Sequence, residues 1–281
     1  AGARQLSRLQ LDRRIRIMEV CGTHTTEYFR SGIRDRFPDG LELIDGPGCP
    51  VCVTPTGYLD RAIAIARKYG VVITTFGDLM KVPASTGSLL AERGRGLDIR
   101  VVYSPADALK IARTTPGREI MFLSVGFETT VPLEAAAVEE ARETGLSNFS
   151  LLTGNKLTPP AVRALLASGE TPIDGFILPG HVCTIIGLDP WQFIGRRFQK
   201  PSVVAGFSRR HILSSTLKLV SLIRERCTDV VNDYPEAVSP AGNPRAWKLV
   251  QRVFWRIGDR WRGIGRIPDS GLALRPAWKN F

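Results

Sequence analysis

Val71-Val-Ile-Thr-Thr-Phe76 is a continuous run of β-branched residues that ends on an aromatic ring. A strand with one face in water alternates apolar and polar residues, whereas a strand buried on both faces is apolar or β-branched throughout. The run is therefore typical of an inner strand of a parallel sheet that is covered by helices on both sides.

Short apolar runs of this kind alternate with amphipathic segments along most of the chain, which is the pattern of strands joined by crossover helices. The expected strands cover residues 15–20, 41–44, 71–76, 99–103, 120–125, 149–152, 175–178 and 202–205. The expected helices cover residues 57–69, 106–113, 133–144, 161–167 and 212–226. Pro105 and Pro160 at helix starts, and Gly70 and Gly145 at helix ends, agree with these boundaries.

Eight strands fit two lobes better than one sheet. The sequence therefore predicts an α/β protein of two lobes, each with a helix-flanked parallel sheet of thioredoxin-like or doubly wound type. With a division near Thr115-Pro-Gly117, the first lobe spans residues 1–116 and the second residues 117–230. Residues 231–281 are rich in Gly, Pro and Trp, and we expect an irregular C-terminal strap that packs across the lobes.

The composition is that of a globular protein from a reducing compartment. The chain has 281 residues, 43% of them hydrophobic, which is enough for a core without disulfide staples. Five cysteines are few for a secreted disulfide scaffold, and no apolar run reaches the length of a signal peptide core or a membrane span. We therefore expect a cytoplasmic protein that does not enter a membrane.

The formal charge of the chain is +11. Its Lys and Arg residues are scattered, and no RNP motif, zinc finger or basic zipper organises them. A solvated basic surface explains this charge, and a basic face can equally attract an acidic protein partner. We expect no nucleic acid among the partners.

The least ordinary polar motifs all follow expected strands. They are Cys21-Gly-Thr-His24, Gly48-Cys-Pro-Val-Cys52, Phe76-Gly-Asp78, Gly126-Phe-Glu-Thr-Thr130 and Pro179-Gly-His-Val-Cys183. Ligands of open parallel sheets bind outside the carboxyl ends of the strands. We therefore expect the motifs to line one shared crevice.

Cys49 and Cys52 form a C-x-x-C pair, a spacing that permits a disulfide and a two-electron redox cycle. One such pair also supplies half of a zinc site, and a pair of inert structural thiols is the third interpretation. Pro47, Gly48 and Pro50 make a rigid loop whose backbone can approach a ligand closely. The spacing favours the redox pair and leaves the other two interpretations open.

Further residues are candidates for a site beside this pair. Cys21 is either a metal-ligating or nucleophilic thiolate or a small buried side chain, and His24 is placed to act as its base or partner. His181 is a ligand, a proton donor or a core histidine. Glu128 is a loop anchor or a proton carrier. His211 lies in an Arg-rich segment, and we expect it to be solvated.

These motifs are similar to those of the hydrogenase maturation factor HypD family. The resemblance rests on Cys21-Gly-Thr-His-Thr25, Gly46-Pro-Gly-Cys-Pro-Val-Cys-Val-Thr-Pro55, Phe76-Gly-Asp-Leu-Met-Lys-Val-Pro83, Gly126-Phe-Glu-Thr-Thr130, Pro179-Gly-His-Val182, Asn243 and residues 261–272. The motifs occur in order and span almost the whole chain.

The resemblance implies a scaffold, rather than a turnover enzyme, on which the Fe(CN)2CO group of NiFe hydrogenase is assembled. Its partners would be a HypC-type chaperone and then a HypE-type cyanide donor. By the same resemblance, Cys21 would hold the iron together with a partner cysteine, while Cys49 and Cys52 would supply electrons. The group would also contact Thr23, Gly126 and Gly180, and the crevice would be lined by His24, Glu128 and His181.

The chain also departs from the family. Its members continue into a cysteine-rich C-terminal region that binds a 4Fe-4S cluster, whereas no cysteine follows Cys227 here. The sequence is thus either truncated or a variant without the cluster. In addition, Ser208-Arg-Arg-His211 replaces an expected acidic segment, and Asn155 stands where a histidine is usual.

Two other functions stay open on the residues alone. In a stand-alone thiol-disulfide oxidoreductase, Cys49 would attack a substrate disulfide and Cys52 would resolve the mixed disulfide. A decayed paralogue would keep the fold and bind a partner without assembling iron. Infrared bands of cyanide and carbon monoxide would distinguish the scaffold from both.

Overall fold

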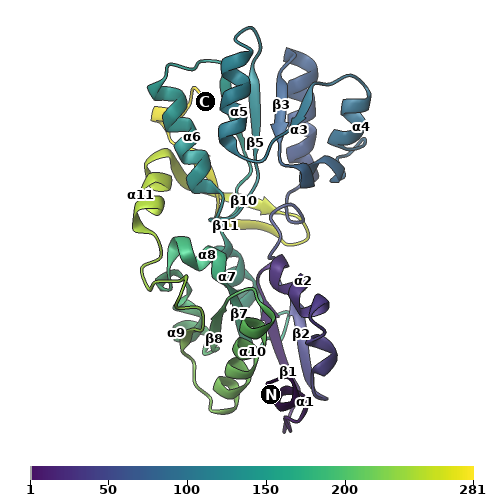
Figure 1. The fold of residues 1–281 in the computed structure, drawn as a ribbon, viewed down its shortest axis with the longest axis vertical. Coiled ribbons are helices and arrows are strands. Elements are labelled where there is room, and N and C mark those ends of the chain that lie inside the picture. The colour runs from purple at the N-terminus through teal and green to yellow at the C-terminus, as the bar shows by residue number, and fades with distance from the viewer. Residues whose placement is uncertain (1) are drawn as a thin grey trace. The chain divides into compact units, whose positions relative to one another are not determined.

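The computed structural model describes residues 2–281 and forms two compact units (Figure 1). Unit 1 contains the chain up to Cys49 together with Thr158–Pro244, and unit 2 contains Pro50–Leu157 and Arg245–Phe281. Two lobes are as expected, whereas the bounds of the units differ from the expected residues 1–116 and 117–230. Strands β3 (Val72–Thr75) and β5 (Ile120–Ser124), which lie on either side of the expected division, pair directly with each other.

Unit 1 is built on a five-stranded parallel sheet in the order β2-β1-β7-β8-β9. Its strands are β1 (Ile15–Glu19), β2 (Leu41–Asp45), β7 (Gly175–Pro179), β8 (Ser202–Ala205) and β9 (Val230–Asn232). Strand β1 has β2 on one side and β7 on the other. Because all pairings are parallel, the residues that follow β1, β2, β7 and β8 emerge at the same edge of the sheet.

Helices cover the sheet of unit 1, and three of them begin within four residues of the end of a strand. They are α1 (Gly2–Ser7), α2 (Gly22–Arg30), α7 (Thr158–Ser168), α8 (Gly180–Ile186), α9 (Phe193–Phe198) and α10 (Arg209–Arg224), with short 3-10 turns at Arg34–Arg36 and Asp189–Trp191. Figure 1 shows α10 alongside β7 and β8. Ile212 and Leu219 of α10 pack in one core with Ile177 and Val203 of these strands.

Unit 2 is built on a four-stranded parallel sheet in the order β4-β3-β5-β6. Its outer strands are β4 (Ile99–Val101) and β6 (Phe149–Thr153). Strand β5 is buried along its whole length: Phe122 faces a core with the helices on one side, and Met121 and Leu123 face a separate core on the other. This burial on two faces, shared by β3, confirms the expectation drawn from residues 71–76.

The helices of unit 2 lie on both faces of this sheet. They are α3 (Thr56–Tyr69), α4 (Leu89–Gly94), α5 (Pro105–Thr114) and α6 (Val131–Glu143), with a 3-10 turn at Gly77–Lys81. Helix α5 begins with a capping box, in which the Ser104 side chain and the Asp107 side chain each accept a backbone N–H of the other residue. Helix α3 ends at Gly70, whose backbone is left-handed (φ 67°), as its position in the sequence predicted.

The C-terminal part of the chain is more regular than the expected strap. After residues 231–243 in unit 1, helix α11 (Pro244–Val253) leads into an antiparallel hairpin of β10 (Phe254–Trp261) and β11 (Gly265–Leu274), followed by a 3-10 turn at Pro276–Trp278. The tail thus contains a helix and a hairpin that the sequence did not indicate. The alternation of apolar and polar residues does not predict the hairpin, because its register shifts between Ile257 and Asp259 and because β11 contains Pro268 and Gly271, which are unusual within strands.

The α/β class and the helix-flanked parallel sheets are confirmed. Every pairing within the two main sheets is parallel, which agrees with the doubly wound type. Among residues 2–281, no helix has the length and apolar character needed to cross a bilayer.

Candidate functional site

Cys21 occupies the turn between β1 and α2. It is the N-cap residue of α2, with extended backbone (φ −156°, ψ 118°), and Thr25 N–H donates to its carbonyl over 3.1 Å. The Cys21 N–H donates to Glu19 Oε2 over 2.7 Å, and the Thr25 hydroxyl donates to Glu19 Oε1. Glu19, the last residue of β1, therefore fixes the turn that carries the half-buried Cys21 thiol.

The loop after β2 lies directly against this turn. The Gly22 N–H donates to Gly48 O over 3.0 Å. A β-carbon on Gly48 would lie 2.4 Å from Cys21 N and 2.5 Å from Cys21 Cα, so only glycine fits between the two loops. Because Gly48 precedes Cys49, the Cys21 turn lies against the start of the second thiol motif, within unit 1.

Cys49 and Cys52 are both disulfide-bonded, whereas Cys21 is a free thiol. The turn around them is closed by the Thr54 hydroxyl, which donates to Pro50 O over 2.8 Å. A C-x-x-C pair in the disulfide state has released two electrons and two protons and can take them back from a reductant. The geometry therefore agrees with a redox pair beside a separate thiol.

His24 is fully buried, and its ring stacks on Phe207 with a centroid separation of 4.7 Å and an interplanar angle of 26°. Phe207 also stacks on His181, at 3.7 Å and 19°. The phenyl ring thus contacts both imidazoles. Among the described residues 2–281, neither ring nitrogen of His24 has a hydrogen-bond partner. Burying such atoms is unfavourable, which favours a role for His24 that involves a ligand.

Burial sets the protonation states of this site. It lowers the pKa of His24 to about 4, and the backbone of Ala205 and Gly206 opposes that shift without reaching hydrogen-bond geometry. It raises the pKa of Glu19 to about 7, although the carboxyl group accepts two hydrogen bonds. Burial likewise raises the pKa of the Cys21 thiol. At neutral pH the site therefore contains a neutral imidazole and a protonated thiol.

All three histidines of the sequence belong to one aromatic cluster of unit 1. His181 is exposed, and its partial burial lowers its pKa. His211 packs against Tyr234 with a centroid separation of 5.0 Å, and its Nε2 lies 2.9 Å from Glu236 Oε1. Tyr234 in turn meets Phe207 edge-on at 6.3 Å. The expectation of a solvated His211 is therefore wrong.

Two motif glycines are explained by the atoms that surround them. A β-carbon on Gly180 would lie 2.4 Å from Ala205 O, and one on Gly126 would lie 1.7 Å from Thr130 Oγ1. The Thr130 hydroxyl donates to Phe127 O over 3.1 Å and so closes the turn after β5. Both glycines permit a tight turn at the carboxyl end of a strand, β7 in unit 1 and β5 in unit 2.

The Gly126–Thr130 motif of unit 2 is held by the C-terminal hairpin. Phe127 stacks on Trp261 at 6.0 Å and 21°, and Lys156 N–H donates to Gly126 O over 2.9 Å. The side chain of Lys156 is buried and forms an ion pair with Asp259 of β10, and burial lowers its pKa. These contacts fix the turn that carries Glu128, itself a buried residue.

A closed hydrogen-bonded group lies behind this turn. Ser124 Oγ is 2.6 Å from Glu134 Oε2 and 2.5 Å from Asn155 Oδ1, and the Asn155 amide donates to Glu134 Oε2 over 2.9 Å. A serine hydroxyl has a single hydrogen and cannot donate to both oxygens. These three contacts are compatible when Glu134 keeps its proton on Oε2 and donates to Ser124, while Glu134 Oε1 has no hydrogen-bond partner among residues 2–281. Burial raises the pKa of Glu134 to about 7, in agreement with this assignment.

The predicted site residues are divided between the two units. Unit 1 holds Cys21, Thr23, His24, Cys49, Gly180 and His181, and unit 2 holds Cys52, Gly126 and Glu128. Within unit 1, Gly48 joins the two thiol motifs and Phe207 joins the two histidines. A single crevice for all of these residues stays a prediction.

The sequence interpretation missed Glu19, Phe207 and Glu134. Glu19 follows the apolar residues Ile17 and Met18 within an expected strand, which was a readable signal, because a buried charge there must be paired or neutralised. Phe207 directly follows a strand, as the recognised motifs do. Glu134 gave no signal, because an acidic residue in the first turn of a helix is ordinary.

The fold and its thiol motifs define an α/β protein with cysteine chemistry at the carboxyl ends of its strands. The profile of one family, HypD, described as "Hydrogenase formation hypA family", matches residues 2–281. The chain therefore belongs to the HypD family of hydrogenase maturation factors.

Curated relatives match the chain over most of its length. The chain is 44% identical to the hydrogenase maturation factor HypD of Azotobacter vinelandii over 96% of this chain and 73% of that protein. It is 43% identical to HypD of Rhizobium leguminosarum bv. viciae, over 99% and 75% of the two chains. The identity to HypD of Escherichia coli K12 is 42%, over 96% and 73%.

Proposed function

We propose that this chain is a scaffold for assembly of the Fe(CN)2CO group of NiFe hydrogenase, working with a HypC-type chaperone. One observation carries the proposal: the Cys21 turn lies against Gly48, so a free thiol is held next to the first cysteine of a redox pair. Membership of the HypD family supports it, because the relatives are named hydrogenase maturation factors. Iron is the cargo of this reaction.

In this proposal Cys21 supplies one thiolate ligand to the iron. Thiolate is a soft, electron-rich donor that suits iron carrying cyanide and carbon monoxide. Within residues 2–281, no group of three or more His, Cys, Asp or Glu side chains is arranged to hold a metal ion. By the resemblance to the family, the other ligands would be a cysteine of the chaperone and the diatomic groups, and the complex of the two proteins would be the metal-binding species.

Cys49 and Cys52 act in this proposal as a two-electron couple. Oxidation of the two thiols forms one S–S bond and releases two electrons and two protons to the group under assembly. A HypE-type protein would then donate the cyanide groups. This sequence contains no cysteine set for the 4Fe-4S cluster of the family, so no step is assigned to that cluster.

The remaining predicted residues would shape the space around the iron. His24, neutral at pH 7, would offer one ring nitrogen to a diatomic ligand as a hydrogen-bond donor. His181, on Phe207, would line the entrance. Thr23 and Gly180 of unit 1, with Gly126 and Glu128 of unit 2, are assigned to contacts with the group.

The test is anaerobic co-purification with the HypC-type partner, followed by iron analysis and infrared spectroscopy. Cys21→Ala is expected to remove the cyanide and carbonyl bands. Cys227→Ala is the matched control, because Cys227 is a second thiol of unit 1 that donates to Asp229 at 3.1 Å. Bands at the wild-type level in Cys21→Ala would rule out the ligand role.

Two other results would assign a different function. Absence of the bands together with reduction of insulin disulfides would indicate the stand-alone oxidoreductase, with Cys49 as the attacking thiol. Binding of the chaperone without iron and without disulfide reduction would indicate a paralogue that has lost the assembly reaction.

A further inference from the structure

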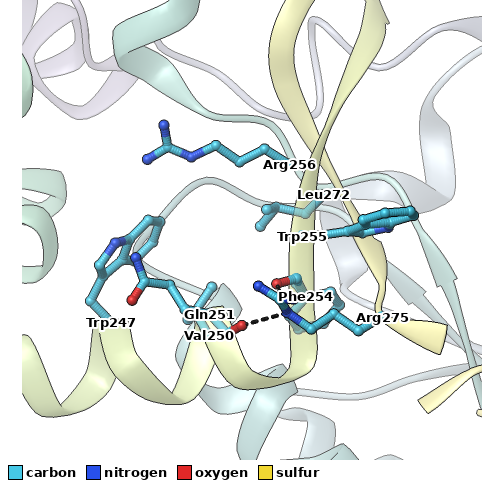
Figure 2. Close-up of a pocket in the computed structure, with 8 residues that line it drawn as sticks. All are labelled: Trp247, Val250, Gln251, Phe254, Trp255, Arg256, Leu272 and Arg275. Carbon is cyan, nitrogen blue, oxygen red and sulfur yellow. Dashed lines mark hydrogen bonds between the residues drawn. The ribbon is translucent and has the colours of Figure 1, made fainter. Parts of the chain in front are cut away.

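Unit 2 contains a pocket that the proposed function does not use. It lies between α11 and the hairpin of β10 and β11, and it has a volume of about 310 Å³ (Figure 2). Small-molecule sites begin at roughly this volume. The pocket is therefore large enough for one or two amino-acid side chains and too small for a folded element.

The floor of the pocket is apolar and rigid. Val250, Phe254 and Leu272 line it, and all three are buried members of the core that unit 2 forms around β5 and β6. Trp247 and Trp255 stand at its sides, half-buried and exposed respectively. An exposed tryptophan such as Trp255 beside a well-packed floor is typical of positions that anchor a binding partner.

The rim of the pocket is cationic. Arg256 is exposed, and no acidic side chain pairs with it within residues 2–281. Figure 2 shows its side chain extending from β10 on the side of α11 where Trp247 lies. Arg275 Nε donates to Gln251 O over 2.7 Å and to Phe254 O over 3.1 Å, which holds that guanidinium beside the pocket. No lining residue is acidic.

The surrounding segment has the same sign of charge. Residues 245–281 contain nine Lys and Arg and two Asp, so they carry a formal charge of +7 out of +11 for the chain. One of the two acidic residues, Asp259, is already paired with Lys156. The segment that builds this pocket thus carries most of the net positive charge of the chain, which favours an anionic occupant.

We propose that the pocket binds an acidic segment of a partner protein. The segment places one aromatic or long aliphatic side chain between Trp247 and Leu272 and a carboxylate against Arg256. A carboxylate matches the planar guanidinium in a two-point hydrogen bond. A nucleic acid fits less well, because it needs a row of cations along its backbone, whereas the lining of this pocket offers only Arg256 and Arg275.

The probe is a fluorescein-labelled Asp-Glu-Phe-Glu-Asp peptide, titrated with the full chain at low salt and followed by fluorescence anisotropy. Saturable binding that weakens with salt is expected. Two control peptides, one with Ser in place of Phe and one with Asn and Gln in place of the acids, are expected to bind more weakly. The first control peptide lacks the side chain that enters the pocket, and the second lacks the carboxylates that pair with Arg256.

Matched variants place the binding at the pocket. Arg256→Glu is expected to lower the affinity about tenfold, since it replaces attraction by repulsion. Arg266→Glu makes the same charge change at an exposed position of β11 outside the pocket, and it should change the affinity less than about twofold. Cys21→Ala should bind the peptide as the wild type does, which separates this test from that of the proposed function.

Three results would overturn the proposal: no saturable binding up to about 1 mM peptide, equal losses in Arg256→Glu and Arg266→Glu, or tighter Arg256-dependent binding of single-stranded oligothymidylate. Without saturable binding there is no peptide site. Equal losses in the two variants would show a general basic surface in place of a specific pocket, and tighter binding of the oligonucleotide would assign the pocket to nucleic acid. Thermal melting of each variant shows whether a loss of binding reflects unfolding.

Discussion

Glu134→Gln tests the buried proton of unit 2. The Glu134 side chain is fully buried, and burial raises its pKa from an ordinary 4.5 to about 7. For an acid with a raised pKa, the contribution to stability is complete below the unfolded pKa and is lost as the pH rises to the folded pKa. The difference between 4.5 and about 7 corresponds to about 3 kcal/mol of folding free energy. Glutamine carries no charge, and its amide oxygen at the Oε2 position can still accept from Asn155, while the Ser124 hydroxyl donates to Asn155 Oδ1.

The assay is urea denaturation of both proteins, followed by far-UV circular dichroism across this pH range. The free energy of unfolding of the variant should match that of the wild type at about pH 4.5 and exceed it by about 3 kcal/mol at about pH 8. Glu143→Gln, at an exposed position of the same helix, should show no such difference. A Glu134→Gln effect of equal size at both pH values would refute the assignment of a proton to Glu134.

Phe207→Ala should admit water to His24 and raise the pKa of His24 from about 4 toward 6.5. NMR titration of the imidazole measures this pKa, and an unchanged value would contradict the burial of His24 by Phe207. Gly48→Ala should destabilise unit 1 by about 2 to 4 kcal/mol in thermal melting, because its β-carbon overlaps backbone. Gly57→Ala is the control, since a β-carbon there meets nothing within 4 Å, and equal losses would refute the packing argument. Reduction of the Cys49–Cys52 disulfide should expose two further thiols to a thiol reagent in the wild type and none in Cys52→Ser. No increase in the wild type would mean that Cys49 and Cys52 were already reduced.

The strands could be predicted from the sequence because local composition determines them. A segment such as Ser202–Ala205 is apolar and β-branched, and the structure gives it the bounds that the sequence indicated. The division into lobes could not be predicted, because pairing in a parallel sheet joins distant segments. Ile17 lies opposite Gly175, and no local pattern in either strand specifies that partner.

Two kinds of element escaped the sequence pattern. Helix α2 begins Gly-Thr-His-Thr-Thr, a run of weak helix formers, so its propensity gave no signal. It forms because Glu19 and the Cys21 carbonyl fix its first turn through tertiary and capping contacts. The β10 and β11 hairpin could not be predicted because its Gly and Pro residues indicate a loop. Its strands pair because they contact the core of unit 2.

The candidate site could be predicted in part, because its residues follow strands. That rule found Cys21, Cys49 and His181, and the parallel sheet of unit 1 accounts for their common edge. It did not find Phe207, because an apolar residue after a strand is normally core. Only the packing shows that this ring contacts both imidazoles.

The motif glycines explain why the site depends on close backbone contacts. Gly46, Gly48 and Gly126 are not among the glycines with a positive φ, so conformational freedom does not account for them. Each is instead a place where a β-carbon would overlap another atom, Glu19 O in the case of Gly46. A side chain at Gly48 would push the Cys21 turn away from the loop that carries Cys49. The separation of the free thiol from the redox pair is therefore set by backbone packing, and it can be changed without altering any thiol.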